Sequence, residues 1–252
     1  MNRADLCTRA GVEFALTTVV LFVAVTVVRW VRDDGSPLFI ADLGAALAVI
    51  GAISGSLLTG LILSPLGRRS GGHLNPAVTI AVWAMGMFPG RAVVPYAVAQ
   101  LAGSVAGTGL AWLVWREPAS HLGLGAIQPA LTWTPAAVFS AEAGSMAVLF
   151  VVLGVLVERG HARLVPYTIG LAVGLVIAVL GPLSGGSINP ARQLGPAVLS
   201  GETNDLWIYL VAPVLGAALG SVLWRFRHEY LGSRRDWRRW TTARAHAGGR
   251  RP

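Results

Sequence analysis

Charged side chains are scarce in this chain of 252 residues. Only 13% of the residues are Asp, Glu, Lys or Arg, whereas 54% are hydrophobic and the mean hydropathy is +0.62. A soluble domain usually has about a quarter of its residues charged. The composition therefore excludes an ordinary soluble domain and predicts a chain that is embedded in a membrane.

Cysteine is nearly absent and lysine is wholly absent. Cys7 is the only cysteine, so the chain can form neither an internal disulfide nor a metal site of several thiolates. All 20 basic residues are Arg, a usage typical of a GC-rich bacterial genome. The sequence also shows no nucleophile–base set and no cluster of metal ligands, so we expect no enzyme activity, no cofactor and no metal.

Long hydrophobic runs account for most of the chain. They lie near residues 12–30, 40–63, 92–114, 136–157, 165–182 and 206–224. Each is long enough, or nearly so, to cross a hydrocarbon core of ~30 Å as a helix. A helix is required because lipid offers no hydrogen-bond partners to backbone N–H and C=O groups. The predicted fold class is an all-α membrane protein with six transmembrane helices.

The arginines predict the orientation of these spans. With the N-terminus inside, the outer connections hold only Arg29, Arg32, Arg116 and Arg192, and all other arginines lie on the inner side. This asymmetry follows the positive-inside rule. It favours a multi-pass protein of the plasma (cytoplasmic) membrane with both termini cytoplasmic. It also explains the net charge of +8 without a nucleic-acid partner.

The tripeptide Asn-Pro-Ala occurs twice, inside closely similar phrases. The first is Asn75, Pro76 and Ala77 in SGGHLNPAV at 70–78, and the second is Asn189, Pro190 and Ala191 in SGGSINPAR at 184–192. The copies are 189 − 75 = 114 residues apart. Matching breaks in two membrane halves indicate a site near the bilayer midplane. The mismatch of Val78 with Arg192 predicts a neutral and a charged side.

A unit of three spans is thus repeated, and an odd number inverts the second unit in the membrane. We expect a cytoplasmic N-terminus at 1–9 and a first repeat at 10–115 with a re-entrant loop at 64–86. An extracytoplasmic linker at 116–134 leads to a second repeat at 135–227 with a re-entrant loop at 183–199. A basic cytoplasmic tail at 228–252 lies on anionic headgroups or is solvated.

Each Asn-Pro pair is suited to open a short half-helix. Asn is a strong N-cap, and Pro fits the first helical position, where its missing donor costs nothing. Once the side-chain oxygen caps the helix, the amide N–H groups are left to face a lumen. Two helix N-termini, each about +0.5 charge and ~5 Å from a cation at a dielectric of ~20, repel it by roughly 3 kcal/mol. The pattern predicts a passive path for neutral solutes.

Two carboxylates fall inside apolar spans and need partners there. Glu13 in the first span and Glu142 in the fourth are expected to accept hydrogen bonds from the N–H groups of their own re-entrant loops. A proton relay is the alternative. His73 is expected to support the first loop by hydrogen bonding, and a pH gate is its alternative. The pairs Gly103/Gly107, Gly170/Gly174 and Gly216/Gly220 are interpreted as helix-packing sites.

With these motifs the chain resembles the aquaporin, or major intrinsic protein, family over about residues 10 to 227. The likeness rests on both Asn-Pro-Ala boxes, the Arg after the second, Glu in spans one and four, and Pro-Tyr…Ala-Gln at 95–100. It implies six helices with two half-helices, one pore per subunit and a homotetramer. It also implies a narrow ring at the outer mouth, carried over to Gly55, Ile177, Gly186 and Arg192. The first of these could shift by one residue to Ser54 or Ser56.

This ring lacks the aromatic and the His of strict water channels. It looks like the ring of plant nodulin-like intrinsic proteins, which pass glycerol and metalloid hydroxides. We therefore expect a channel in the lipid bilayer for water and small neutral solutes (glycerol, boric or arsenous acid) that excludes protons and ions. A strictly water-selective channel and a secondary transporter built on an inverted repeat are the alternatives.

Overall fold

The computed structural model describes residues 2–231, and all its regular elements in this range are helical. The long helices are α1 (Arg3–Arg32), α2 (Leu43–Leu63), α5 (Val93–Trp115), α7 (Pro135–Glu158), α8 (Val165–Leu180) and α10 (Leu206–Leu231). The short ones are α3 (Pro65–Ser70), α4 (Pro76–Ala84), α6 (Glu117–Ser120) and α9 (Pro190–Ser200), with 3-10 turns at Gly90–Ala92, Gly123–Gly125 and Ala162–Leu164.

Six helices are long and apolar enough to cross a membrane, and they coincide with the six predicted spans. The first helix begins earlier than its apolar run, at Arg3. Its first turn is capped, because the side chain of Asn2 accepts a hydrogen bond from the N–H of Asp5 at 2.8 Å, and Asp5 pairs with Arg9 one turn later. The predicted N-terminal segment 1–9 is therefore mostly helix.

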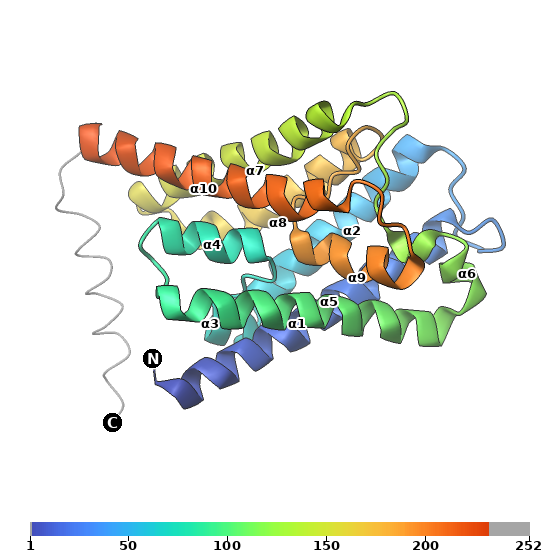
Figure 1. Cartoon of the computed structure of the whole chain (residues 1–252), viewed down its shortest axis with the longest axis horizontal. Coiled ribbons are helices and arrows are strands. Elements are labelled where there is room, and N and C mark those ends of the chain that lie inside the picture. Colours follow the sequence, from blue (N-terminus) through green and yellow to red (C-terminus); the bar gives the residue numbers. More distant parts are fainter. Residues whose placement is uncertain (1, 232–252) are drawn as a thin grey trace.

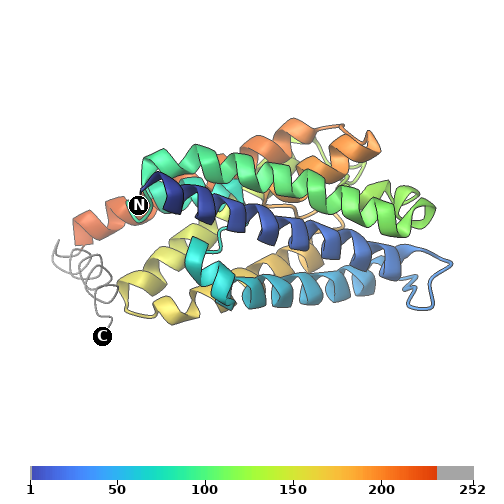
Figure 2. The ribbon, with the colours of Figure 1, turned by 90° about the horizontal axis from the view of Figure 1, so that it is seen from below.

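The long helices form a bundle around the two half-helices. Helix α1 packs along α5, α7 along α10, and α2 along α8, while α4 contacts α10 and α9 contacts α5. Figure 1 shows α4 and α9 following one another in the middle of the bundle, between α10 above and α5 below. The start of α1 and the end of α10 lie at the same end of the bundle, as an even number of spans requires (Figures 1 and 2).

Glycines let the paired helices approach until backbone touches backbone. A Cβ atom on Gly55 of α2 would overlap the carbonyl oxygen of Gly170 on α8. On α10, a Cβ on Gly216 would overlap the carbonyl oxygen of Ala143 on α7. Gly103 of α5 meets the carbonyl of Phe14 on α1 in the same way. These contacts agree with the predicted role of the Gly-x-x-x-Gly pairs in helix packing.

Each half-helix is bonded to a long helix of the other repeat through one serine. The hydroxyl of Ser104 on α5 donates to the carbonyl of Ala191 on α9 and accepts from the N–H of Gly195 at 2.8 Å. In the mirror arrangement, Ser221 of α10 donates to the carbonyl of Ala81 on α4 at 3.3 Å. The two repeats are therefore interlocked at the centre of the bundle and are not merely adjacent.

The predicted basic tail at 228–252 lies largely outside the described residues. Its first residues, 228–231, belong to the end of α10, which continues past the predicted span end at 224.

The close helix contacts predict a sharp difference between two glycines of the α7–α10 pair. Gly216→Ala should lower the thermal unfolding temperature of the detergent-solubilised protein, because overpacking against a backbone carbonyl costs about 1–3 kcal/mol. Gly144→Ala on α7, where an added Cβ meets nothing within 4 Å, is the control and should leave that temperature unchanged or raise it. Equal unfolding temperatures for both variants would contradict the packing.

Candidate functional site: a cavity between two re-entrant loops

Both Asn residues of the repeated motif cap the half-helices that follow them. The side-chain oxygen of Asn75 accepts a hydrogen bond from the N–H of Ala77 at 2.8 Å, and that of Asn189 accepts one from Ala191 at 2.9 Å. Pro76 and Pro190 occupy the first helical positions. The half-helices run from Pro76 to Ala84 and from Pro190 to Ser200, and both are short, as expected from the sequence.

The residue before each Asn has a left-handed backbone. Leu74 has φ 54° and Ile188 has φ 43°, although neither is glycine. Such a conformation costs about 1–3 kcal/mol for a non-glycine residue and persists only where its surroundings enforce it. Here it points the residue's N–H toward a buried carboxylate and its carbonyl toward the opposite loop.

The carboxylates that enforce this shape are Glu13 and Glu142, both fully buried. Glu142 accepts from the hydroxyl of Ser184 at 3.0 Å and from the N–H groups of Ser187 at 3.1 Å and Ile188 at 2.6 Å. Three or more donors around a buried carboxylate compensate for the hydration it has lost. This geometry is that of a loop support, and neither carboxylate belongs to the wall of the cavity described below.

Glu13 holds the first loop with the same pattern and one donor more. It accepts from the hydroxyl of Ser70 at 2.7 Å, from the N–H groups of His73 at 3.0 Å and Leu74 at 2.7 Å, and from the side-chain amide of Gln100 at 2.7 Å. The additional donor, Gln100, belongs to α5, so Glu13 also ties the first loop to that helix.

His73 lies at the inner side of this network and lines the cavity. Its Nδ1 is 3.1 Å from the hydroxyl of Thr79, and its ring packs edge-on against Phe88 at 4.8 Å between centroids. The side chain of Thr79 in turn contacts the amide of Gln100 at 3.1 Å. His73 is thus placed by both its backbone and its ring, as expected for a residue that supports the loop.

The two loops are joined directly by the Asn side chains. The amide of Asn75 donates to the carbonyl of Ile188 at 2.9 Å, and the amide of Asn189 donates to the carbonyl of Leu74 at 3.0 Å. The sequence led us to expect that the whole amide is free for the lumen. Each amide instead uses one hydrogen in this crossed pair and keeps the other, so the donors are fixed in direction as well as in number.

A cavity of about 280 Å³ runs past both Asn residues. Its wall is mostly apolar where α1, α2, α7 and α8 face it, with Arg32 and Ser54 as exceptions, and more polar where the two loops face it. The apolar wall includes Val20, Ile50, Leu57, Leu58, Leu149, Val173 and Ile177. Val78 and Arg192, which follow the two motifs, both line it. Among the described lining residues there is no carboxylate, so the fixed charges at the wall are those of Arg32 and Arg192.

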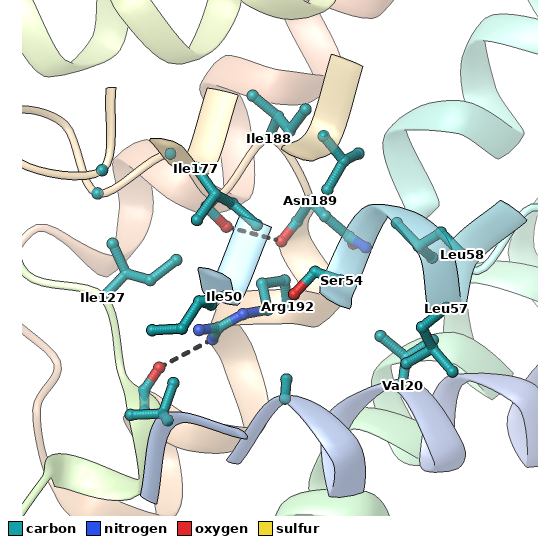
Figure 3. A pocket seen from close by; sticks show the side chains of 18 of the residues that line it. Val20, Ile50, Ser54, Leu57, Leu58, Ile127, Ile177, Ile188, Asn189 and Arg192 are labelled. Carbon is teal, nitrogen blue, oxygen red and sulfur yellow. Dashed lines mark hydrogen bonds between the residues drawn. The ribbon is translucent and has the colours of Figure 1, made fainter. Parts of the chain in front are cut away.

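Three of the four residues predicted for the outer ring lie at the cavity wall. Ile177, Gly186 and Arg192 line the cavity. Arg192 donates to the carbonyl of Gly125 at 2.9 Å, as the dashed line in Figure 3 shows. At Gly186, whose φ is 64°, a Cβ would lie 2.8 Å from the carbonyl oxygen of Val176, so only glycine fits.

The expectation for Gly55 has to be corrected. Gly55 is absent from the cavity wall and packs against the backbone of Gly170, whereas Ser54 lines the cavity (Figure 3). Successive residues of a helix point about 100° apart, so the face that packs on α8 cannot also face the lumen. The residue of α2 that lines the cavity is therefore Ser54, which has a small polar side chain, and not Gly55, which has none.

The linker between the repeats also contributes to the cavity, which the sequence analysis did not predict. Gly125, Ala126, Ile127 and Gln128 line the cavity beside Arg192. Figure 3 shows Ile127 near Ile177, on the same side of the cavity as the guanidinium of Arg192. The linker carries no motif, and only its tertiary contacts bring it to the pore mouth.

The support by Glu142 predicts a specific loss when the carboxylate is removed. Glu142→Gln replaces one of the two acceptor oxygens by an N–H₂ group, which then faces one or two of the three donors, and buried groups left unpaired cost about 1–3 kcal/mol each. We expect a lower unfolding temperature and a lower water permeability in proteoliposomes. Glu158→Gln, at the end of the same helix, removes only surface ion pairs with Arg227 and His228, which contribute little to stability, and as the control should change neither by a comparable amount. Normal water permeability in Glu142→Gln would refute the supporting role.

Comparison with known proteins agrees with this architecture. Residues 2–224 match the family described as Major intrinsic protein. Aquaporin NIP3-1 of Oryza sativa subsp. japonica is 36% identical over 220 residues, which cover 86% of this chain and 67% of the rice protein. The probable aquaporin AqpM of Archaeoglobus fulgidus is 38% identical over 182 residues, or 70% of this chain and 73% of that protein.

The fold is also that of a solved structure. The X-ray structure of the aquaglyceroporin from Plasmodium falciparum superposes with a TM-score of 0.72, covering 87% of this chain and 95% of that chain at 20% sequence identity. The family match over nearly the whole chain, and relatives above 30% identity, show that this chain belongs to the major intrinsic protein family.

Proposed function

We propose that this channel passes glycerol-sized neutral solutes, among them glycerol and boric or arsenous acid, as well as water. The broader class follows from the family: the chain is a multi-pass membrane channel for the passive movement of water and small solutes, and it is not an enzyme. The proposal concerns which solutes pass and which residues select them.

The observation that carries the proposal is the set of side chains around Arg192. Ser54, Ile177 and Gly186 line the cavity with Arg192, so one position is glycine, one is a small hydroxyl and one is apolar. None of the three is an aromatic ring or a His that would narrow the passage. A solute with several hydroxyls can turn its carbon side to the apolar wall and its oxygens to Arg192 and the loops.

The same wall supports the exclusion of cations and protons. The remaining amide hydrogens of Asn75 and Asn189 are donors at the meeting point of two helix N-termini, which carry positive partial charge. No described lining residue is a carboxylate that could bind a coupling cation. A water molecule there accepts hydrogen bonds and so interrupts the donor order that proton hopping needs.

The placement of the protein completes the proposal. We place it in the plasma membrane with both termini cytoplasmic, as the arginine distribution supports, and with inverted repeats at 10–115 and 135–227. Large apolar side chains on the outside of the bundle, such as Val94 and Leu171, are suited to lipid or to neighbouring subunits of a homotetramer. The all-arginine usage supports a bacterial source.

Paired flux measurements test the solute range. Purified protein in proteoliposomes should pass both water and glycerol in stopped-flow experiments, and boric acid should follow, because the ring lacks bulky groups. Water flux without glycerol or boric acid flux would instead indicate a strictly water-selective channel. Glycerol transport that saturates and requires an ion gradient would indicate a secondary transporter.

Removing the charge at the ring tests the role of Arg192. Arg192→Val places at the second motif the residue that follows the first, Val78, and removes about 3 kcal/mol of repulsion for a cation at ~5 Å and a dielectric of ~20. We expect increased cation leak, by up to about a hundredfold, measured by ion flux in proteoliposomes. Arg159→Val removes the same charge away from the cavity wall and should leave ion flux at background. If the cation flux of Arg192→Val equals that of wild type, Arg192 does not exclude cations from the lumen.

A further inference from the structure

We infer that Gln193 is a positioning residue that fastens the outer linker across the pore mouth, so that Ile127 and the carbonyl of Gly125 complete the narrow ring. This inference rests on the proposed function, because it concerns the size of solute that the ring admits. We call residues 123–130 of the linker the strap.

The side chain of Gln193 pairs with both backbone groups of a single strap residue. Its oxygen accepts from the N–H of Ile127 at 2.9 Å, and its amide nitrogen donates to the carbonyl of Ile127 at 2.9 Å. Gln193 is fully buried and Ile127 nearly so, at 0% and 9% exposure. Asp or Ser cannot reproduce this pairing, because it needs a donor and an acceptor side by side at the end of a long side chain.

The strap is attached at its two ends by other contacts. Gly123, Leu124 and Gly125 all have positive φ, and the side chain of Leu124 is buried in a cluster with Val25 and Ala111. At the far end, the N–H of Ala130 donates to the carbonyl of Leu183 at 2.8 Å. Between these ends the side chain of Gln128 donates to the exposed carboxylate of Glu202 at 3.0 Å, and Gln193 supplies both of the hydrogen bonds that hold the backbone of Ile127.

The middle of the strap is the part that lines the pore. The side chain of Ile127 fills the space above Gly185, where an added Cβ would overlap its Cγ2 atom. Two residues earlier, the carbonyl of Gly125 accepts the hydrogen bond from Arg192. Figure 3 shows Arg192 bonded to this carbonyl, with Ile127 close by.

Arg192 and Gln193 are neighbours in the first turn of α9, so this turn places both the guanidinium and the strap beside it. If the clamp on Ile127 is lost, its N–H and carbonyl must find water, and the strap can reach water only by moving outward. That movement would withdraw the side chain of Ile127 from the cavity wall. It would also carry away the carbonyl of Gly125, which accepts the hydrogen bond from Arg192. The ring would widen without any change in the two Asn-Pro-Ala motifs.

Thiol labelling tests the position of the strap independently of transport. In a Cys7→Ser background, Ile127→Cys supplies a single thiol for a membrane-impermeant reagent added to the protein in liposomes. Gln193→Met, which keeps the length but removes the pairing, should raise the labelling rate about tenfold, which corresponds to a loss of about 1.4 kcal/mol. Thr108→Val removes a buried hydroxyl that bonds within α5 and should leave the rate unchanged.

Solute flux tests the effect of the strap on selection. Gln193→Met should raise the permeability of a four-carbon polyol relative to water by about tenfold, for the same loss of pairing. Gln193→Glu should do so at neutral and alkaline pH, where the carboxyl group is ionised, but not in acidic buffer. When protonated, its carboxyl group accepts from and donates to Ile127 as the amide does; when ionised, it cannot donate to the carbonyl, and the adjacent Arg192 draws it away. Wild type should show no such pH dependence.

The outcomes separate this inference from the proposed function. Unchanged labelling of the thiol introduced by Ile127→Cys and an unchanged polyol-to-water ratio in Gln193→Met would overturn the positioning role. So would a Gln193→Glu variant whose ratio does not respond to pH. If wild type passes water but no glycerol, the proposed solute range fails, while the labelling result still decides whether Gln193 holds the strap.

Discussion

Two buried carboxylates determine the shape of the pore. A carboxylate in the middle of a membrane bundle is stable only when donors surround it, and here the donors come mainly from the two re-entrant loops. The hydrogen bonds from the N–H groups of Leu74 and Ile188 to these carboxylates hold both residues in left-handed conformations. In this conformation each carbonyl points toward the opposite loop. Those carbonyls receive the amides of the two Asn residues. The two amides that we propose select the solute are thus held in place through carboxylates that do not line the cavity.

The two halves share one backbone arrangement, but equivalent positions carry side chains with different hydrogen-bond partners. Thr79 and Gln193 both lie four residues after their Asn, since 75 + 4 = 79 and 189 + 4 = 193. Thr79 joins an inner network with His73 and Gln100, whereas Gln193 reaches outward to the linker. Symmetry thus accounts for the crossed Asn pair at the centre. The difference between Val78 and Arg192 places a charge directly after only one of the two motifs.

Much of the fold could be predicted from the sequence, because lipid leaves a chain few choices. The six spans, the two half-helices, the capping by Asn75 and Asn189 and the glycine contacts all follow from local pattern. The prediction was wrong at Gly55, where a shift of one residue rotates a side chain by about 100° from lumen to helix contact. The strap was missed because its place depends on hydrogen bonds between residues 66 apart.

The most direct measurement of the central claim is an experimental map of the channel in lipid that resolves ordered water in the lumen. We expect the amide of Asn75 within hydrogen-bonding distance of the carbonyl of Ile188, and that of Asn189 likewise at Leu74. A water or glycerol oxygen should lie against the remaining hydrogens of both amides. A map with the two Asn side chains apart, or turned from the solute path, would contradict the account.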